Sequence, residues 1–266
     1  MAVALDLIPY ETLEEQVEAM YRDGFAYLPG VLNAAQIAEL REHMDVLTPN
    51  PESFDKNLTA EEHGYVNRHI NNTFNRDPLF LSFLDRRPVV DIAEAIHGDD
   101  CHSIGMTAWM TGPGRPDQKL HIDWLPLELP PDVLADPRVR TPIFITTAHF
   151  YLDDLDEDLG PTNFIPGSHL SGCKPDGATS WNGHGERSIM CKAGDVVIFR
   201  SEVWHRGTAN TSDRTRFLLQ VHYAMRMITQ KYPPYLNRFQ FDPAILEAAN
   251  ERQLRLMGNH RSSNYD

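Results

Sequence analysis

Residues 143–152 read IFITTAHFYL, and this stretch decides the fold class. Seven of its ten residues are β-branched or aromatic, the types that are enriched in β-strands. Similar segments follow along the chain, separated by Gly-Asp, Pro-Gly and Asn-Thr-Ser turn signals: Ser188–Cys191, Val196–Phe199 and Phe217–Met225. Short strands spaced in this way are typical of a sandwich or jelly roll, which we therefore expect over residues 101–227.

The part before this β-rich region has helical periodicity. In TLEEQVEAMYR, residues 12–22, the apolar positions recur on one helix face, and Gly24 ends the helix. After a short β-like piece, Phe25–Leu28, Asn33 can cap a second amphipathic helix. Further helices are expected at three places: Pro78–Leu84, Pro88–His97 and Asp242–Met257.

These segments are expected to form one domain over residues 1–266. The chain contains no internal repeat, no low-complexity run and no linker rich in Gly, Ser or Pro. It divides into a helical part, 1–100, a jelly-roll core, 101–227, and a C-terminal helix with a polar tail, 228–266. The fold class is thus mainly β with flanking helices, the N-terminal ones packed on the core.

Composition excludes several classes of protein. The chain of 266 residues carries 24 Lys and Arg against 38 Asp and Glu, a net charge of −14, which disfavours nucleic acid as a partner. No apolar stretch is long enough to span a membrane, and no signal peptide is recognisable. The three scattered cysteines indicate a reducing compartment, so we expect a cytoplasmic protein. Surface carboxylates for solubility explain the charge, although they also hint at a cationic substrate.

The chemistry is concentrated around His121-Ile122-Asp123. In an extended strand, residues two apart point to the same face, so His121 and Asp123 would supply two corners of a metal site. His205, which follows the strongly β segment 196–199, is the best candidate for a third ligand. Two histidines and one carboxylate leave three positions open on iron, which suits a bidentate keto acid and O2. Any strand can carry such a His-x-Asp pair by chance, and the chain has twelve histidines.

Arg216 lies eleven residues after His205 and adds to this pattern. If residues 214–220 form a strand, Arg214, Arg216 and Gln220 share one face. An arginine that points into a barrel needs an anionic partner, and the distal carboxylate of 2-oxoglutarate would match its fork. A salt bridge to one of the many acidic residues is the alternative.

With these residues in view, the chain resembles the phytanoyl-CoA dioxygenase family of Fe(II)/2-oxoglutarate enzymes. Four stretches carry the likeness in the family's order: residues 24–32 (GFAYLPGVL), 121–123 (HID), 160–169 (GPTNFIPGSH) and 194–216. Together they span most of the chain.

The resemblance implies a double-stranded β-helix core and a reaction that uses Fe(II), 2-oxoglutarate and O2, with ascorbate as a reductant in assays. It also implies that Gln118 and Thr208 lie near the keto acid, and Asn163 is a further candidate because its strand should face the pocket. Related halogenases replace the carboxylate ligand by a small residue. Since Asp123 is intact, hydroxylation or another C–H oxidation is expected.

Other functions remain open at this point. A zinc or manganese hydrolase or isomerase on a cupin-like barrel could use the same ligands, and a non-catalytic jelly roll could bind small molecules. We expect a small-molecule substrate, a polar secondary metabolite such as a cationic aminoglycoside or amino acid derivative, and the sequence indicates no particular oligomeric state. We expect His149 and His222 to pack in the core or next to the site. Arg115 and Lys119 are expected in a solvated loop, with contact to the substrate at the rim of the pocket as the alternative.

Overall fold

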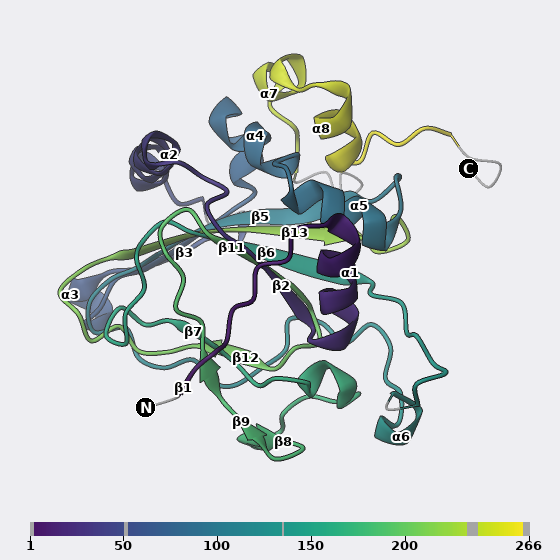
Figure 1. The fold of residues 1–266 in the computed structure, drawn as a ribbon. Helices are drawn as coiled ribbons and strands as arrows, with labels where there is room; N and C mark the ends of the chain where they lie inside the picture. The colour runs from purple at the N-terminus through teal and green to yellow at the C-terminus, as the bar shows by residue number, and fades with distance from the viewer. Residues whose placement is uncertain (1–2, 51–52, 135, 233–238, 263–266) are drawn as a thin grey trace.

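The computed structural model describes residues 3–50, 53–134, 136–232 and 239–262 of the chain. Figure 1 shows a β core with most of its helices gathered above the larger sheet and a smaller sheet below it. The expected mainly-β jelly roll with flanking helices is confirmed. Each helix in the described part of the chain is too short or too polar to cross a membrane.

The larger sheet has seven antiparallel strands and forms the wall on which the site is built. In spatial order they are β2 (Phe25–Leu28), β11 (Val196–Arg200), β6 (Ile145–Tyr151), β13 (Arg216–Ala224), β5 (His102–Thr111), β4 (Asn67–Asn71) and β3 (Lys56–Leu58). The stretch 143–152 thus supplies a fully buried central strand.

The smaller sheet faces the inner side of the larger one and carries a candidate ligand. Its strands, in spatial order, are β1 (Val3–Ala4), β10 (Arg187–Ser188), β7 (Thr162–Phe164) and β12 (His205–Gly207). A separate hairpin is formed by β8 (Ser180–Trp181) and β9 (His184–Gly185). Between the two sheets, Phe164, Phe199 and Leu218 pack in one apolar cluster, which closes the barrel beside the site.

The helices of the described residues lie mostly over the outer face of the larger sheet (Figure 1). They are α1 (Leu13–Arg22), α2 (Ala34–Val46), α3 (Ala60–His63), α4 (Leu81–Leu84), α5 (Val89–His97), α6 (Pro131–Leu134), α7 (Pro243–Ala248) and α8 (Glu251–Leu256). Met20 and Leu40 of the first two helices are buried in the same cluster as Leu219 and Tyr223 of β13. Thr12 and Asn33 each close a capping box, and the cap at Asn33 was predicted.

Three expected elements differ in extent. The helical part also holds β3 and β4, which extend the larger sheet beyond β5. The expected C-terminal helix is divided in two, because Asn250 caps the start of α8. The strand expected at Ser188–Cys191 keeps only Ser188 in a ladder, since the carbonyl of Cys191 already bonds the amide of Leu155.

Candidate metal centre

His121, Asp123 and His205 come together in the structure. One ligand atom from each lies within 4.8 Å of the others, and Oδ1 of Asp123 is 3.7 Å from Nε2 of His205. His121 and His205 exchange backbone hydrogen bonds of 2.9 and 2.8 Å across an isolated antiparallel bridge. The expected strand at 121–123 is therefore reduced to this bridge, because the amide of Asp123 turns away to the carbonyl of Ser201 at 3.1 Å.

The tautomers of both histidines are fixed by backbone carbonyls. Nδ1 of His121 lies 2.7 Å from the carbonyl of Lys119, and Nδ1 of His205 lies 2.9 Å from that of Val203. Carbonyl oxygens only accept, so both Nδ1 atoms donate and both Nε2 lone pairs are left for a metal. Burial lowers the pKa of His205 and favours its neutral, metal-binding form, although the Asp123 carboxylate opposes this. The two histidines and the carboxylate fit a divalent iron.

Thr147, on β6, supports the carboxylate of the group. Its Oγ1 donates to Oδ2 of Asp123 at 3.1 Å and lies 2.9 Å from Nδ1 of His222. This contact was not predicted, although the alternation within residues 143–152 places Thr147, His149 and Tyr151 on one strand face.

A second hydrogen-bonded chain fixes the wall beside the histidines. The indole of Trp109 can only donate, so it bonds Oε1 of Gln220 at 2.6 Å. The amide nitrogen of Gln220 then donates to Nε2 of His149 at 2.7 Å. Burial drives the pKa of His149 well below its usual value, with help from the nearby His205 and Arg216. The expectation that His149 and His222 pack near the site agrees with these contacts.

Two buried arginines occupy the other end of the same cavity. Arg216 is 3% exposed and Arg115 is 4% exposed. Nη1 of Arg216 contacts the carbonyl of Gly160, while Nη1 of Arg115 bonds the carbonyls of Pro116 and Gly207 at 2.7 and 3.2 Å. Nε of Arg216 and Nη2 of Arg115 are buried without a hydrogen-bond partner.

Neither guanidinium forms an ion pair with a carboxylate of the described residues. Burial, and then the neighbouring Arg216, lower the pKa of Arg115 to about 10. Two buried like charges with unpaired N–H groups are costly unless an anion lies between them, so this end of the cavity fits a carboxylate. Arg115 was expected in a solvated loop, and that was wrong. Two backbone hydrogen bonds hold its loop against the core: the amide of Gly114 donates to the carbonyl of Asn210, and the amide of Asn210 donates to the carbonyl of Arg115.

The three candidate ligands and the two arginines line one cavity of about 160 Å³. Gln118 also lines it, with Oε1 accepting the amide of Gly207 at 2.8 Å. Arg214, which was expected to share the strand face of Arg216, lies before β13, is exposed and pairs with Asp156.

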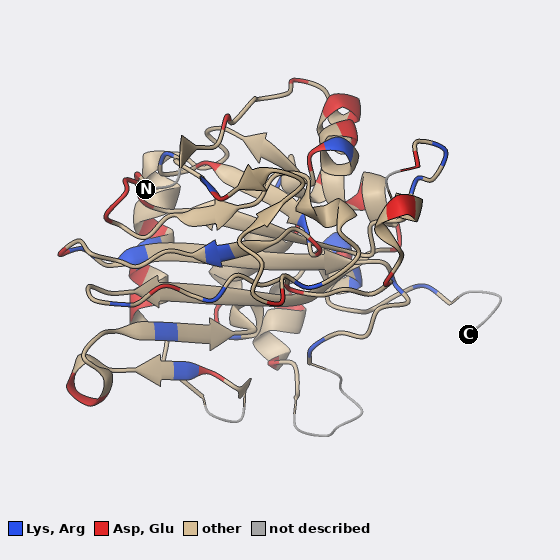
Figure 2. Ribbon diagram, turned by 90° about the horizontal axis from the view of Figure 1, so that it is seen from below, with Lys and Arg blue, Asp and Glu red and all other residues tan. Residues whose placement is uncertain are grey.

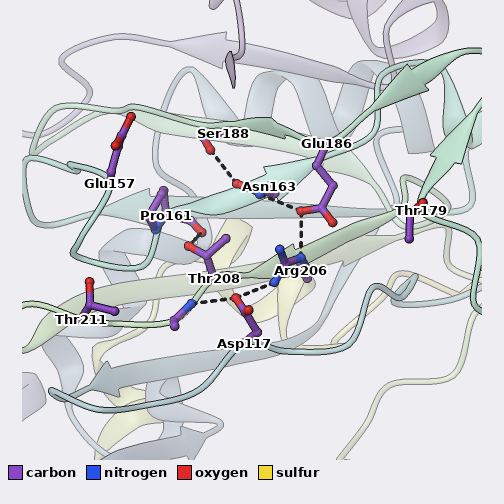
Figure 3. Close-up of a pocket in the computed structure, with 11 residues that line it drawn as sticks. Asp117, Glu157, Pro161, Asn163, Thr179, Glu186, Ser188, Arg206, Thr208 and Thr211 are labelled. Atoms are coloured by element: carbon purple, nitrogen blue, oxygen red, sulfur yellow. Dashed lines mark hydrogen bonds and ion pairs between the residues drawn. The ribbon is translucent and has the colours of Figure 1, made fainter. Parts of the chain in front are cut away.

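Asn163 and Thr208 do not line this cavity. They line a different, more open cavity on the outer side of the smaller sheet (Figure 3). Asn163 donates to Glu186 at 2.7 Å, and Thr208 donates to the carbonyl of Pro161 at 2.8 Å. Residues alternate between the two faces of a strand, and Thr162 of β7 already faces the arginines. Asn163 therefore faces outward, and its expected place beside the keto acid is corrected, as is that of Thr208.

Comparisons with known proteins extend these observations. The family described as "Phytanoyl-CoA dioxygenase (PhyH)" matches residues 20–218. Dioxygenase ALT11 of Alternaria alternata is 25% identical over 95% of this chain and 84% of its own length. Dioxygenase cdmA of Talaromyces verruculosus is 26% identical over 83% of this chain and 76% of its own length.

Solved structures share the fold. The α-ketoglutarate-dependent carbocyclase SnoK of nogalamycin biosynthesis superposes with a TM-score of 0.64 at 20% identity, over 89% of this chain and 96% of its own. HygX of Streptomyces hygroscopicus, solved with nickel, 2-oxoglutarate and hygromycin B, gives a TM-score of 0.60 at 16% identity, over 81% and 88%. The fold and the family match define a non-haem iron, 2-oxoglutarate-dependent dioxygenase. The chain belongs to the phytanoyl-CoA dioxygenase family, as its resemblance indicated.

Proposed function

We propose that this dioxygenase oxidises a C–H bond of a small secondary metabolite at an iron held by His121, Asp123 and His205. The observation that supports this most directly is the pairing of two features in one cavity. Two free Nε2 atoms and a carboxylate lie beside one another, and two unpaired guanidinium groups lie at the other end. A keto acid with two carboxylates can bind the metal with its keto end and the guanidinium groups with its distal carboxylate.

Iron, when bound there, supplies the activation of O2 that couples loss of CO2 from 2-oxoglutarate to oxidation of the substrate. The protein's part is binding and orientation. Arg216 and Arg115 hold the distal carboxylate of the keto acid, and Gln118 lies beside its path. Leu218 and Trp109 line the wall along it and limit the access of water. One oxygen atom of O2 enters succinate, and in a hydroxylation the other enters the product alcohol.

A metal-dependent hydrolase or isomerase on the same barrel is the rival function. It would use the same three ligands but would have no need of two buried guanidiniums opposite them. The arginine pair therefore favours the oxygenase. The cleavage of a C–H bond is common to hydroxylation, ring closure and epimerisation. SnoK is a carbocyclase, and SnoN of nogalamycin biosynthesis, which shares the fold, is an epimerase.

The test measures two separate properties of purified protein. In the absence of O2, addition of 2-oxoglutarate to the Fe(II)-loaded protein should produce a visible charge-transfer band. With O2 and ascorbate, succinate should then be released slowly. His121→Ala should abolish both signals by removing the metal. Arg216→Ala should keep Fe(II) but weaken 2-oxoglutarate binding at least about tenfold, a loss of about 1.4 kcal/mol.

Arg214→Ala is the matched control, because Arg214 is exposed and pairs with Asp156 outside the cavity. It should behave like the wild type in both assays. Protein that binds a divalent metal but shows no band and no succinate with 2-oxoglutarate would refute the oxygenase and favour the hydrolase or isomerase.

A further inference from the structure

A substrate would bind in the part of the cavity that lies on the far side of the metal ligands from the two arginines. Thr111 of β5 pairs with Arg216 of β13, whereas Gly105 pairs with His222, six residues further along β13. Lys231 packs over this far end: a Cβ placed on Gly105 would lie 3.4 Å from Cδ of Lys231. The cavity thus has the arginines at one end and Lys231 at the other, with Asp123 and Thr147 near His222 between them.

Lys231 is held in place but forms no ion pair among the residues that the structure describes. Its backbone amide donates to the carbonyl of Ile104 at 3.0 Å, and its Nζ lies 4.3 Å from the centroid of the Trp124 ring. The Trp124 ring meets His222 edge-on, with 5.4 Å between centroids. The side chain is exposed to solvent, and it forms no ion pair with any carboxylate of the described residues. A ligand that enters the cavity can therefore reach the ammonium group.

The charges that line the cavity have the opposite sign to the whole chain. Among the described residues that line the cavity, Asp123 is the only acidic one, and it is assigned to the metal, whereas Arg115, Arg216 and Lys231 are basic. Bound iron and dianionic 2-oxoglutarate offset one another, so the cavity keeps a net positive charge. The acidic residues responsible for the net charge of −14 are spread over helices and loops at the periphery (Figure 2). A cationic substrate would find no counter-charge here.

The same wall offers a neutral hydrogen-bonding group. The His69 ring stacks on Trp109 with 3.9 Å between centroids, and its Nδ1 is buried without a partner. Burial lowers the pKa of His69 to about 3, so the ring is uncharged at neutral pH. The ring pair of His69 and Trp109 on this wall and one ammonium group at the end of the cavity fit a planar organic anion.

We infer that the substrate carries a delocalised oxyanion, a carboxylate or the enolate of an acidic enol, which pairs with Lys231. This inference rests on the proposed function and replaces the cationic substrate suggested by the net charge. The pairing directs the oxyanion to the Lys231 end, so that a C–H bond in the body of the substrate faces the metal. Lys231 thereby acts as a specificity-determining residue.

The experiment uses three probes that share one frame: phenylacetate, phenylacetamide and phenethylamine. Their binding to the Fe(II)- and 2-oxoglutarate-loaded protein is measured without O2 from the shift of the charge-transfer band. Phenylacetate should bind at least about tenfold more tightly than the other two. The enolate of 1,3-cyclohexanedione, tested in parallel, shows which oxyanion source is preferred.

Lys231 variants test the assignment of the contact. Lys231→Gln should lose the preference for the anion, Lys231→Arg should keep it, and Lys231→Glu should favour phenethylamine. Lys174→Gln, at an exposed lysine outside the cavity, should match the wild type. The inference is overturned if neither anion is preferred by the wild type, including the case in which no probe binds, or if Lys231→Gln keeps the preference. A protein that forms no complex with 2-oxoglutarate at all would instead refute the proposed function.

Discussion

The hydroxyl of Thr147 donates to Oδ2 of Asp123 over 3.1 Å, on the side of the carboxylate away from the Oδ1 that faces His205. A threonine hydroxyl has one proton, so it accepts its second bond, of 2.9 Å, from Nδ1 of His222. The chain of His222, Thr147 and Asp123 therefore orients the carboxylate while leaving Oδ1 free. Such outer contacts tune the affinity of metal sites.

Thr147→Val should weaken Fe(II) binding about 10- to 100-fold, because the carboxylate loses its orienting donor while the side-chain volume is kept. Competition with a chromophoric chelator measures this affinity. Thr147→Ser, which restores the hydroxyl, should bind iron nearly as well as the wild type. Equal affinity in the valine variant would show that the backbone alone positions Asp123.

Gly172 makes the closest backbone approach among the described glycines. It has a φ of +65°, and a Cβ there would lie 1.9 Å from the carbonyl oxygen of Leu129. Gly172→Ala should destabilise the fold by at least about 3 kcal/mol, from the left-handed backbone and the clash together. Gly177 has a φ of +87° with open space around it, so Gly177→Ala should lose only about 1–2 kcal/mol. Urea denaturation compares the two, and equal losses would contradict the steric argument.

His97 should contribute a pH-dependent part of stability. Nδ1 donates to the carbonyl of Ile143 and Nε2 accepts from Thr146, each at 3.0 Å, so the ring is buried neutral. Burial lowers its pKa from 6.5 to about 3. Below pH 6.5, His97 is protonated in the unfolded chain but stays neutral in the folded chain. Its contribution to the free energy of unfolding is therefore fully present above pH 6.5 and is lost as the pH falls toward 3.

The variant His97→Asn keeps a donor for Ile143 but cannot titrate. Between about pH 6 and pH 4, the slope of unfolding free energy against pH should be shallower than that of wild type by about 1.4 kcal/mol per pH unit. Urea titrations at several pH values measure both slopes. Parallel slopes would mean that His97 is protonated in the folded protein or that acid opens its site locally.

The strands were predictable because their chemistry is local. The β-branched and aromatic residues of 143–152 and 196–199 form central strands as expected. The association of His121, Asp123 and His205 was also anticipated, although the expected strand geometry was wrong. The bridge between His121 and His205 and the bond from Asp123 to Ser201 align the first two, and no local periodicity encodes these contacts.

Long-range packing explains the residues that were missed or misplaced. Arg115 lies in a Pro-Gly-rich segment that is typical of a solvated loop, but contacts with Asn210 and Gly207, far along the chain, hold it in the core. The contact of Thr147 with Asp123 was not predicted, because a threonine in a strand is explained by its β-branched side chain alone. Asn163 was misplaced because β7 has three residues, too few for the sequence to show which face is inward. β7 lies between β10 and β12 in the smaller sheet, and these two partners decide which of its faces points inward.

Gly207→Ala should separate co-substrate binding from stability. A Cβ at this position would lie 2.7 Å from Nη2 of Arg115 and 3.0 Å from Oε1 of Gln118, both at the ends of side chains. The fold can adjust by moving Arg115, so the melting temperature should change little, whereas 2-oxoglutarate affinity should fall about tenfold. Gly185→Ala, in a strand with open space around the glycine, should leave both unchanged. Titration of the charge-transfer band and thermal unfolding give the two values. Unaltered affinity in Gly207→Ala would show that Arg115 does not contact the keto acid, and the distal carboxylate would then belong to Arg216 alone.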